Sequence, residues 1–201
     1  MELYPFNALV ARMKYIPRWG LMRAARTESV GEHAADTAIL AHTLCLLCNH
    51  IFGGSVRAEA VAVAALYHDA SEILTGDMPT PVKYKSEPLR AAYKAVEAEA
   101  AHTLGSMLPG TVRNEMQRCL SGEALTEKER QILKAADRLS ALIKCIEEET
   151  GGNREFTGAQ AQQAAALTAM HCEEAEYFLL HMLPCYRWTL DELTSGSPAE
   201  A

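Results

Sequence analysis

An excess of positive charge is missing from this chain of 201 residues, which carries 19 Lys and Arg against 26 Asp and Glu, a formal net charge of −7. A protein that coats a nucleic-acid polymer needs a basic face to neutralise phosphates, so this class of function is not expected. A small anionic substrate stays open, because binding it requires only a local group of cations.

A hydrophobic run long enough to cross a membrane is also absent. The longest segment without Asp, Glu, Lys or Arg covers 37–56, and it contains His42, Asn49 and His50. A spanning helix would bury too many of these polar groups, so no membrane segment is expected. No apolar stretch precedes a cleavage site at the N-terminus, where arginine recurs from Arg12. An Arg-rich transit peptide is the alternative interpretation. We do not favour it, because residues of this segment are candidates for substrate binding. We therefore expect a cytoplasmic protein.

Cysteine patterns that bind zinc or form redox pairs are scarce. Of the six cysteines, Cys45 and Cys48 form a single C-x-x-C inside the apolar run LCLLC. No second pair follows at the spacing of a zinc site, and no βαβ pattern surrounds it. We interpret the two cysteines as small hydrophobic side chains of a buried helix, with reduced thiols.

Alternating β-branched residues are rare and alanine is abundant, so the pattern is helical almost throughout. Ser29-x-x-Glu32 and Thr126-x-x-Glu129 have the spacing of capping boxes. They predict one helix from about Val30 to before Gly53 and another running to Thr150. The other expected helices are one capped by Ser55 and running into Ala70, one from Pro88 to about Leu108, and one over 157–183, with a loop over 75–82.

These elements predict one all-α domain of about six or seven helices, packed orthogonally rather than as an up-down bundle. The sequence shows no internal repeat and no linker that would divide two domains. We expect the domain to cover 1–193 and a flexible C-terminal tail to cover 194–201.

Four residues stand out as candidates for chemistry: His33, His68, Asp69 and Asp137. Taken alone, a histidine in a first helical turn or a carboxylate in a helix is more often a surface residue. His68 and Asp69 are harder to explain in this way, because they follow the apolar run AVAVAALY. Placing an imidazole and a carboxylate there costs desolvation free energy unless a partner such as a metal ion compensates them.

Neutral imidazole and carboxylate are suitable ligands for Zn, Mn, Fe, Co and Ni, and no thiolate is required. His68 and Asp69 would be adjacent helix positions, about 100° apart around the axis, while His33 and Asp137 would come from two other helices. Two histidines and two aspartates leave coordination positions open for water and substrate, as a catalytic metal requires.

A local group of cations also exists, because segment 3–27 contains five basic residues and no acidic one. Most of them are interpreted as a solvated helix face or a dimer contact. The five are Arg12, Lys14, Arg18, Arg23 and Arg26.

The ordered pattern H…HD…D resembles the HD-domain metal-dependent phosphohydrolases. Three longer strings narrow the resemblance to the YfbR-type 5′-deoxynucleotidases: IPRWGLMRAARTESVGEH at 16–33, ALYHDASEILTGDMPTPVKY at 65–84 and KAADRLSALIKCIEE at 134–148. The resemblance extends from Phe6 to about Leu193 and implies that the expected domain is an HD domain.

The resemblance implies hydrolysis of deoxyribonucleoside 5′-monophosphates (dNMPs) by a homodimer with one divalent cation per site. Cobalt is the favoured ion, and manganese or copper can replace it. The implied metal ligands are His33, His68, Asp69 and Asp137, and three of these, His33, Asp69 and Asp137, are also implied to contact the substrate. The other implied substrate-binding residues are Arg18, which orients the phosphate, Trp19, Asp77, Met78, Pro79 and Thr80.

Two carboxylates carry hypotheses of their own. Glu72 follows His68 by four residues and Asp69 by three, which places all three on one face if the helix persists. Glu72 would then protonate the leaving 5′-oxygen or position the water, or it would only orient His68. Asp77 would accept a hydrogen bond from the 3′-hydroxyl, while Trp19 and the following loop exclude a 2′-hydroxyl. No device for reading the base is visible, so low base selectivity is expected.

Two alternatives stay open. Another HD phosphohydrolase, acting on a cyclic or pyrophosphorylated nucleotide, would share the same four ligands. A helical interaction protein that is only stabilised by metal would use the four residues without turnover.

Overall fold

The computed structural model describes residues 1–83 and 85–197, and these residues are helical apart from turns and one isolated bridge between Pro17 and Ser29. This confirms the all-α prediction. Within these two ranges seven α-helices have nine or more residues and four are shorter, so the helix count is slightly higher than expected. The α-helices are α1 (Phe6–Val10), α2 (Val30–His50), α3 (Ala58–Tyr67), α4 (Glu72–Thr75), α5 (Thr80–Lys83), α6 (Glu87–Ser106), α7 (Gly110–Ser121), α8 (Glu127–Thr150), α9 (Thr157–Thr168), α10 (Glu173–His181) and α11 (Leu190–Ser195). The 3₁₀ helices are η1 (Ala11–Tyr15), η2 (Arg154–Phe156) and η3 (Leu183–Arg187).

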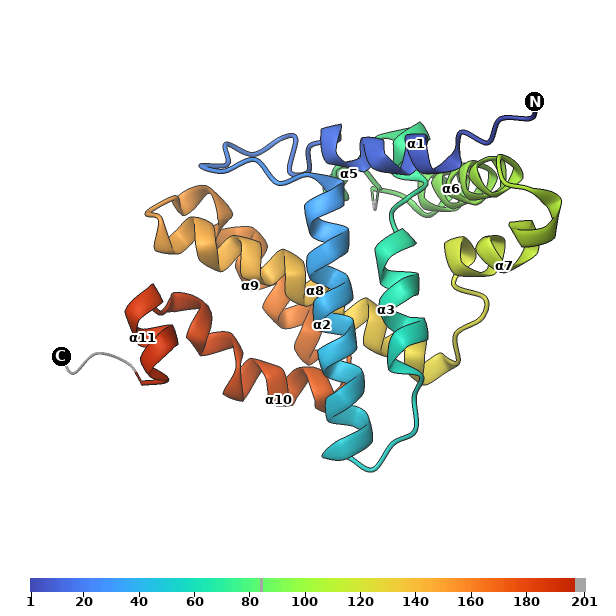
Figure 1. The fold of residues 1–201 in the computed structure, drawn as a ribbon. Coiled ribbons are helices and arrows are strands. Elements are labelled where there is room, and N and C mark those ends of the chain that lie inside the picture. The colour runs from blue at the N-terminus through green and yellow to red at the C-terminus, as the bar shows by residue number, and fades with distance from the viewer. Residues whose placement is uncertain (84, 198–201) are drawn as a thin grey trace.

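Helix α2 lies at the centre of the fold, between α3 and the layer formed by α8, α9 and α10 (Figure 1). In that view α9 and α10 run across the direction of α2, which is the orthogonal arrangement expected. Leu44 of α2 and Ile132 and Leu139 of α8 are fully buried in the main core. Each such side chain contributes roughly 1.5–3 kcal/mol through burial. Together they fix α2 against α8, the two helices that carry His33 and Asp137.

The two predicted capping boxes are both present. Ser29 and Glu32 cap α2, and Thr126 and Glu129 cap α8, each with reciprocal bonds between side chain and backbone. Helices α2 and α8 therefore begin at the expected residues, because these signals act within one turn of the chain.

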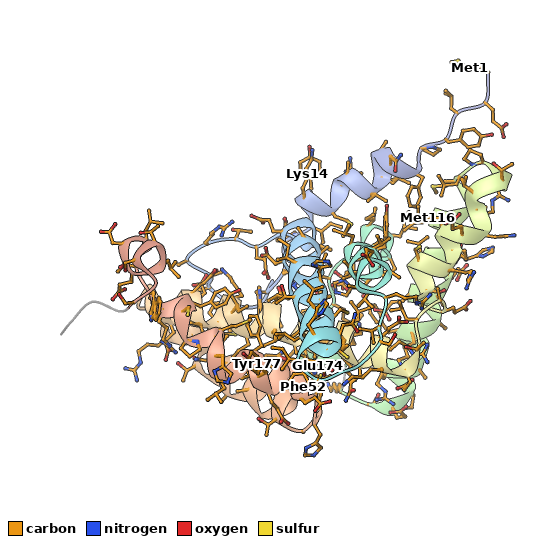
Figure 2. All side chains as sticks on the ribbon, turned by 60° about the horizontal axis from the view of Figure 1, so that its bottom comes forward. Met1, Lys14, Phe52, Met116, Glu174 and Tyr177 are labelled. Atoms are coloured by element: carbon orange, nitrogen blue, oxygen red, sulfur yellow. The ribbon has the colours of Figure 1, made fainter. Side chains whose placement is uncertain are left out.

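Side chains of α10 pack against the C-terminal end of α2. Figure 2 shows Phe52, Glu174 and Tyr177 near this end, where the rings of Phe52 and Tyr177 are 6.1 Å apart. Cys45 and Cys48 are buried and free in the same core, and burial raises the pKa of their thiols to about 12 and about 11. This confirms their interpretation as buried hydrophobic residues.

Three helix boundaries differ from the prediction. Ser55 does not cap α3, which begins at Ala58, because the Asn49 side chain holds both backbone groups of Val56. The chain after Pro109 forms α7, a helix that was not predicted. The expected helix over 157–183 is wrong: α9 ends at Thr168 and α10 begins at Glu173, with His171 at φ 48° between them.

The segments around the candidate site are also less helical than expected. Helix α3 ends at Tyr67, so His68 and Asp69 lie in the following turn and not at helix positions. Of the expected loop over 75–82, only 76–79 lacks regular secondary structure, because α4 includes Thr75 and α5 begins at Thr80. At the C-terminus, α11 includes the first two residues of the expected tail, and 198–201 lie outside the described residues. Within the part of the chain that the structure describes, no helix combines the length and apolarity needed to cross a bilayer.

Candidate functional site

Three separate elements bring the four candidate ligands together. His33 comes from the first turn of α2, His68 and Asp69 from the turn after α3, and Asp137 from the middle of α8. His33 Nε2 lies 3.1 Å from Asp137 Oδ1 and 3.6 Å from Asp69 Oδ2. His68 Nε2 lies 3.2 Å from Asp69 Oδ2 and 3.8 Å from Asp137 Oδ1. The convergence that the ordered pattern predicts is therefore present.

The orientation of the two imidazoles fits a metal ion. His68 Nδ1 donates to the Ala65 carbonyl at 2.7 Å, and His33 Nδ1 lies 3.0 Å from Ser140 Oγ, so both rings turn Nε2 toward the carboxylates. His68 Nε2 is buried and forms no well-aligned hydrogen bond within the described residues. One donor atom from each of His33, His68 and Asp69 can be chosen so that all lie within 4.8 Å of one another. This donor set fits a divalent cation that prefers nitrogen and oxygen ligands.

The electrostatics of this centre favour a positive charge between the side chains. Burial acts to lower the pKa of His68, but Asp69 and Asp137 outweigh it and raise that pKa well above 6.5. Burial acts to raise the pKa of Asp69, but His68 outweighs it and lowers that pKa to about 2. His33 and His68 likewise outweigh burial and hold the pKa of Asp137 well below 3.8. Both carboxylates are therefore ionised near neutral pH, and a bound cation would take the place of the imidazolium proton.

Arg18 and Trp19 lie beside this centre, after η1. Arg18 Nη1 donates to Asp69 Oδ2 at 3.3 Å, and Arg18 Nε donates to Glu28 Oε2 at 3.1 Å. Glu28 Oε2 also accepts from Trp19 Nε1 at 2.7 Å. Trp19 has φ 62°, a strained conformation that persists only where neighbouring contacts hold it. Glu28 is one such neighbour, and no sequence motif points to it, because its role comes from this contact alone.

A buried ion pair on α8 anchors the loop that follows Trp19. Glu148 accepts from the backbone N–H groups of Ala25 and Arg26 at 2.8 and 3.2 Å, and from Asn153 Nδ2 at 2.7 Å. Lys144, its partner, donates to the Arg26 carbonyl at 2.6 Å. Both charged side chains are buried. These contacts hold the segment between Trp19 and α2, and sequence spacing alone did not reveal them.

Replacing Glu148 with alanine is expected to lower the free energy of unfolding by about 3–5 kcal/mol, because it leaves the Lys144 ammonium buried without its partner. Burial acts to raise the pKa of Glu148, but Lys144 and the backbone donors lower it to about 2. The stabilisation is thus complete above pH 4.5 and is lost as the pH falls toward 2.

Urea unfolding at pH 7 and pH 3 measures this effect. Glu149→Ala is the matched control, because Glu149 pairs with Arg187 at the surface, where such a pair contributes about 0–1 kcal/mol. Equal losses in the two variants at pH 7 would contradict the anchoring role of Glu148.

Glu72 is a buried carboxyl group beside the centre, at the start of α4. The helix face predicted to carry both Glu72 and His68 does not form, because α3 ends at Tyr67. Among the described residues its Oε2 has no hydrogen-bond partner. Burial, with the charges of Asp69 and Asp77, raises its pKa to about 9. Glu72 therefore keeps its proton near neutral pH in the metal-free protein.

The raised pKa of Glu72 predicts a pH-dependent stability. The folded state holds this proton up to about pH 9 and the unfolded state releases it near 4.5, so the metal-free protein should lose stability as the pH rises between these values. The loss is on the order of 1 kcal/mol per pH unit. Glu72→Gln removes it, and urea unfolding from pH 5 to 9 in a chelator measures it. The exposed Glu59→Gln change is the control, and parallel curves for all three proteins would refute the assignment.

A cavity of about 260 Å³ opens beside these residues. Of the four candidate metal ligands, Asp137 lines this cavity. Of the other predicted substrate-binding residues, Arg18, Trp19, Asp77, Pro79 and Thr80 line the cavity and Met78 does not. Burial raises the pKa of Asp77. Helices α8 and α9 form a further wall of the cavity, which no sequence motif indicates. It includes Arg138, Ala141, Ala159, Gln162 and Gln163.

Comparison with known proteins identifies relatives that match nearly the whole chain. A family model described as 5′-deoxynucleotidase YfbR-like matches residues 5–186. A 5′-deoxynucleotidase of Citrobacter koseri and the 5′-deoxynucleotidase YfbR of Shigella dysenteriae and Escherichia coli are each 42% identical over 198 residues, covering 98% of this chain and 100% of the relative.

Solved structures share the fold. An HD-domain phosphohydrolase from Listeria innocua aligns with a TM-score of 0.78 and 26% identity, over 90% of this chain and 87% of that one. The cyanophage S-2L HD phosphohydrolase bound to dA and one catalytic zinc ion aligns with a TM-score of 0.65 and 16% identity, over 88% and 95%. The second likeness supports the arrangement of helices alone.

Proposed function

The chain belongs to the YfbR-like family of 5′-deoxynucleotidases, and we propose that this family's reaction, hydrolysis of dNMPs to deoxynucleoside and phosphate, takes place beside Asp137 and Arg18. The observation that carries the assignment is the convergence of His33, His68, Asp69 and Asp137 on one point, with the Arg18 guanidinium 3.3 Å from Asp69. A phosphomonoester requires positive charge on its phosphoryl oxygens and a nucleophilic water.

His33, His68, Asp69 and Asp137 would hold one divalent cation. When bound, this ion lowers the pKa of water and polarises the phosphoryl group. Two imidazoles and two carboxylates are compatible with cobalt, the working ion that the family resemblance implies, and with manganese or copper as substitutes.

Arg18 binds and orients the phosphate. Burial acts to lower the pKa of Arg18, but Glu28 and Asp69 outweigh it and raise that pKa, so the guanidinium stays charged. Its planar fork can donate two parallel hydrogen bonds to phosphate oxygens. Glu28 accepts from Nε and Asp69 accepts from Nη1, which leaves the remaining Nη N–H groups for the ligand.

Glu72 supplies the proton for the leaving 5′-oxygen or positions the attacking water. Its buried carboxyl group suits the first role, since an alkoxide is a poor leaving group without protonation. The orphaned Oε2 supports a role toward a ligand rather than toward a neighbour among the described residues.

Asp77 and Trp19 select the deoxyribose, with Asp77 accepting a hydrogen bond from the 3′-hydroxyl. Replacing Asp77 with alanine is expected to lower kcat/KM for dNMPs by about 10- to 100-fold, the value of a hydrogen bond to a charged group. A 2′,3′-dideoxynucleotide lacks the 3′-hydroxyl donor, so its kcat/KM should fall little further in Asp77→Ala. Phosphate release from the dNMP and from the dideoxynucleotide measures both values. Undiminished turnover of dNMPs by Asp77→Ala would show that Asp77 does not bind the 3′-hydroxyl.

The working form is proposed to be a cytoplasmic homodimer whose HD domain covers 1–193. Exposed apolar side chains support association, with Ile39 66%, Leu180 70% and Leu190 75% exposed. Light scattering coupled to size exclusion measures the assembly.

A substrate screen tests the proposed reaction against its alternatives. The purified protein is incubated with dNMPs, ribonucleoside monophosphates, cyclic nucleotides and pyrophosphorylated nucleotides, in the presence of Co, Mn, Cu, Zn or Mg. Phosphate release from dNMPs supports the proposal. Turnover confined to cyclic or pyrophosphorylated nucleotides would assign another HD phosphohydrolase reaction, and no turnover at all would leave a metal-stabilised interaction protein.

A further inference from the structure

The cavity has a polar wall on α8 and α9 to which the proposed function assigns neither the phosphate nor the sugar. Arg138 follows Asp137 on α8, and Ala159 and Gln163 lie four residues apart on α9, with Gln162 between them. These α9 positions share one face of the helix. The small side chain of Ala159 leaves space, while Gln162 and Gln163 supply polar groups.

Hydrogen-bond donors outnumber acceptors on this wall, because the Arg138 guanidinium carries only donors, while Gln162 and Gln163 each carry one amide oxygen beside an NH₂ group. Arg138 Nη1 donates to Gln163 Oε1 at 3.1 Å, which occupies one of the two lone pairs of that oxygen. The Gln163 NH₂ group then has no partner among residues 1–83 and 85–197, and the remaining Arg138 N–H groups are likewise free of protein acceptors there. The two acidic residues that line the cavity, Asp77 and Asp137, already have roles toward the sugar and the metal.

We propose that Arg138 and Gln163 bind the nucleobase and favour guanine and thymine over adenine. This rests on the proposed function, which places the phosphate at Asp137 and Arg18 and the sugar at Asp77, so that the base meets the remaining wall. Guanine offers the acceptors O6 and N7 and thymine offers carbonyl oxygens, whereas adenine places an amino donor beside N7. A donor-rich wall satisfies the first two and leaves the adenine amino group facing other donors. This differs from the low base selectivity that the sequence indicates.

The wall is half-exposed, so its discrimination between bases should be at the lower end of the range that a bidentate contact to a base provides. We expect wild-type kcat/KM for dGMP and dTMP to exceed that for dAMP by about 5-fold. Gln163→Glu replaces the amide donor with a carboxylate acceptor of nearly the same shape, which accepts from the adenine amino group. This variant should shift the dGMP-to-dAMP ratio toward dAMP, mainly through KM.

The experiment compares kcat/KM for the four dNMPs in the wild type, Gln163→Glu, Gln163→Ala and Gln160→Ala. Gln160 lies on α9 and bonds to Glu149 rather than lining the cavity, so Gln160→Ala should keep the wild-type ratios. Calorimetric binding of deoxyguanosine and deoxyadenosine supplies a readout that does not depend on hydrolysis.

Stronger wild-type turnover and binding with guanine, weakened by Gln163→Ala and shifted toward adenine by Gln163→Glu, supports the assignment. Equal ratios in all four proteins, or a wild-type preference for adenine, overturns it. If dNMPs are hydrolysed with a flat base profile, only this inference fails; if no dNMP is hydrolysed, the proposed function fails, and nucleoside binding still decides the role of the wall.

Discussion

Asp69→Asn is expected to abolish tight metal binding and to reduce dNMP hydrolysis by more than 100-fold. Asp69 Oδ2 lies within 3.6 Å of His33, His68 and Arg18, so this oxygen is shared by the metal centre and the phosphate-binding guanidinium. Loss of even an outer partner of a metal ligand costs about 10- to 100-fold in affinity or activity. Loss of a charged ligand should cost more, while the asparagine keeps the shape of the side chain.

Metal content by elemental analysis and phosphate release at saturating metal measure this prediction. Asp36→Asn is the matched control, because Asp36 is an exposed carboxylate on α2 outside the metal centre. It should bind metal and turn over as the wild type does. An Asp69→Asn protein with one tightly bound ion and near-normal turnover would show that the cation is held elsewhere.

Arg18→Ala is expected to lower kcat by about 10²- to 10³-fold, the usual cost of removing one preorganised group that stabilises transition-state charge. The metal should still bind, because Arg18 is not a ligand. Guanidinium salts at millimolar concentration should restore part of the rate, since the ion can enter the space that the side chain leaves. Arg18→Lys should recover little, because a single ammonium cannot reproduce the planar fork.

Steady-state kinetics with and without guanidinium separates this chemical role from a structural one. Arg12→Ala is the control, because Arg12 belongs to the same basic segment but lies exposed beside Tyr15. A loss of rate in Arg18→Ala without any rescue, accompanied by early thermal unfolding, would instead assign Arg18 to holding the loop in place.

The sequence predicted those features that depend on short-range signals. The capping boxes at Ser29 and Thr126 located the starts of α2 and α8, because their hydrogen bonds close within one turn. The order of His33, His68, Asp69 and Asp137 predicted their convergence, although His68 and Asp69 sit in a turn rather than in a helix.

Features that depend on tertiary contacts could not be predicted from the amino-acid sequence. The break between α9 and α10 has neither glycine nor proline, and His171 adopts a left-handed conformation without any local signal. Glu28 and Glu148 look like ordinary surface acids in the sequence, yet one positions Arg18 and Trp19 and the other anchors the loop behind them. The polar wall at Gln163 likewise exists only because α9 packs against α8.

Anomalous diffraction at the absorption edge of cobalt, from crystals of the metal-loaded protein, locates the bound ion itself. We expect one strong peak per chain, in contact with His33, His68, Asp69 and Asp137, and its loss in Asp69→Asn. A loaded and active protein with no peak among these four side chains, or with its metal bound at another position, would contradict it.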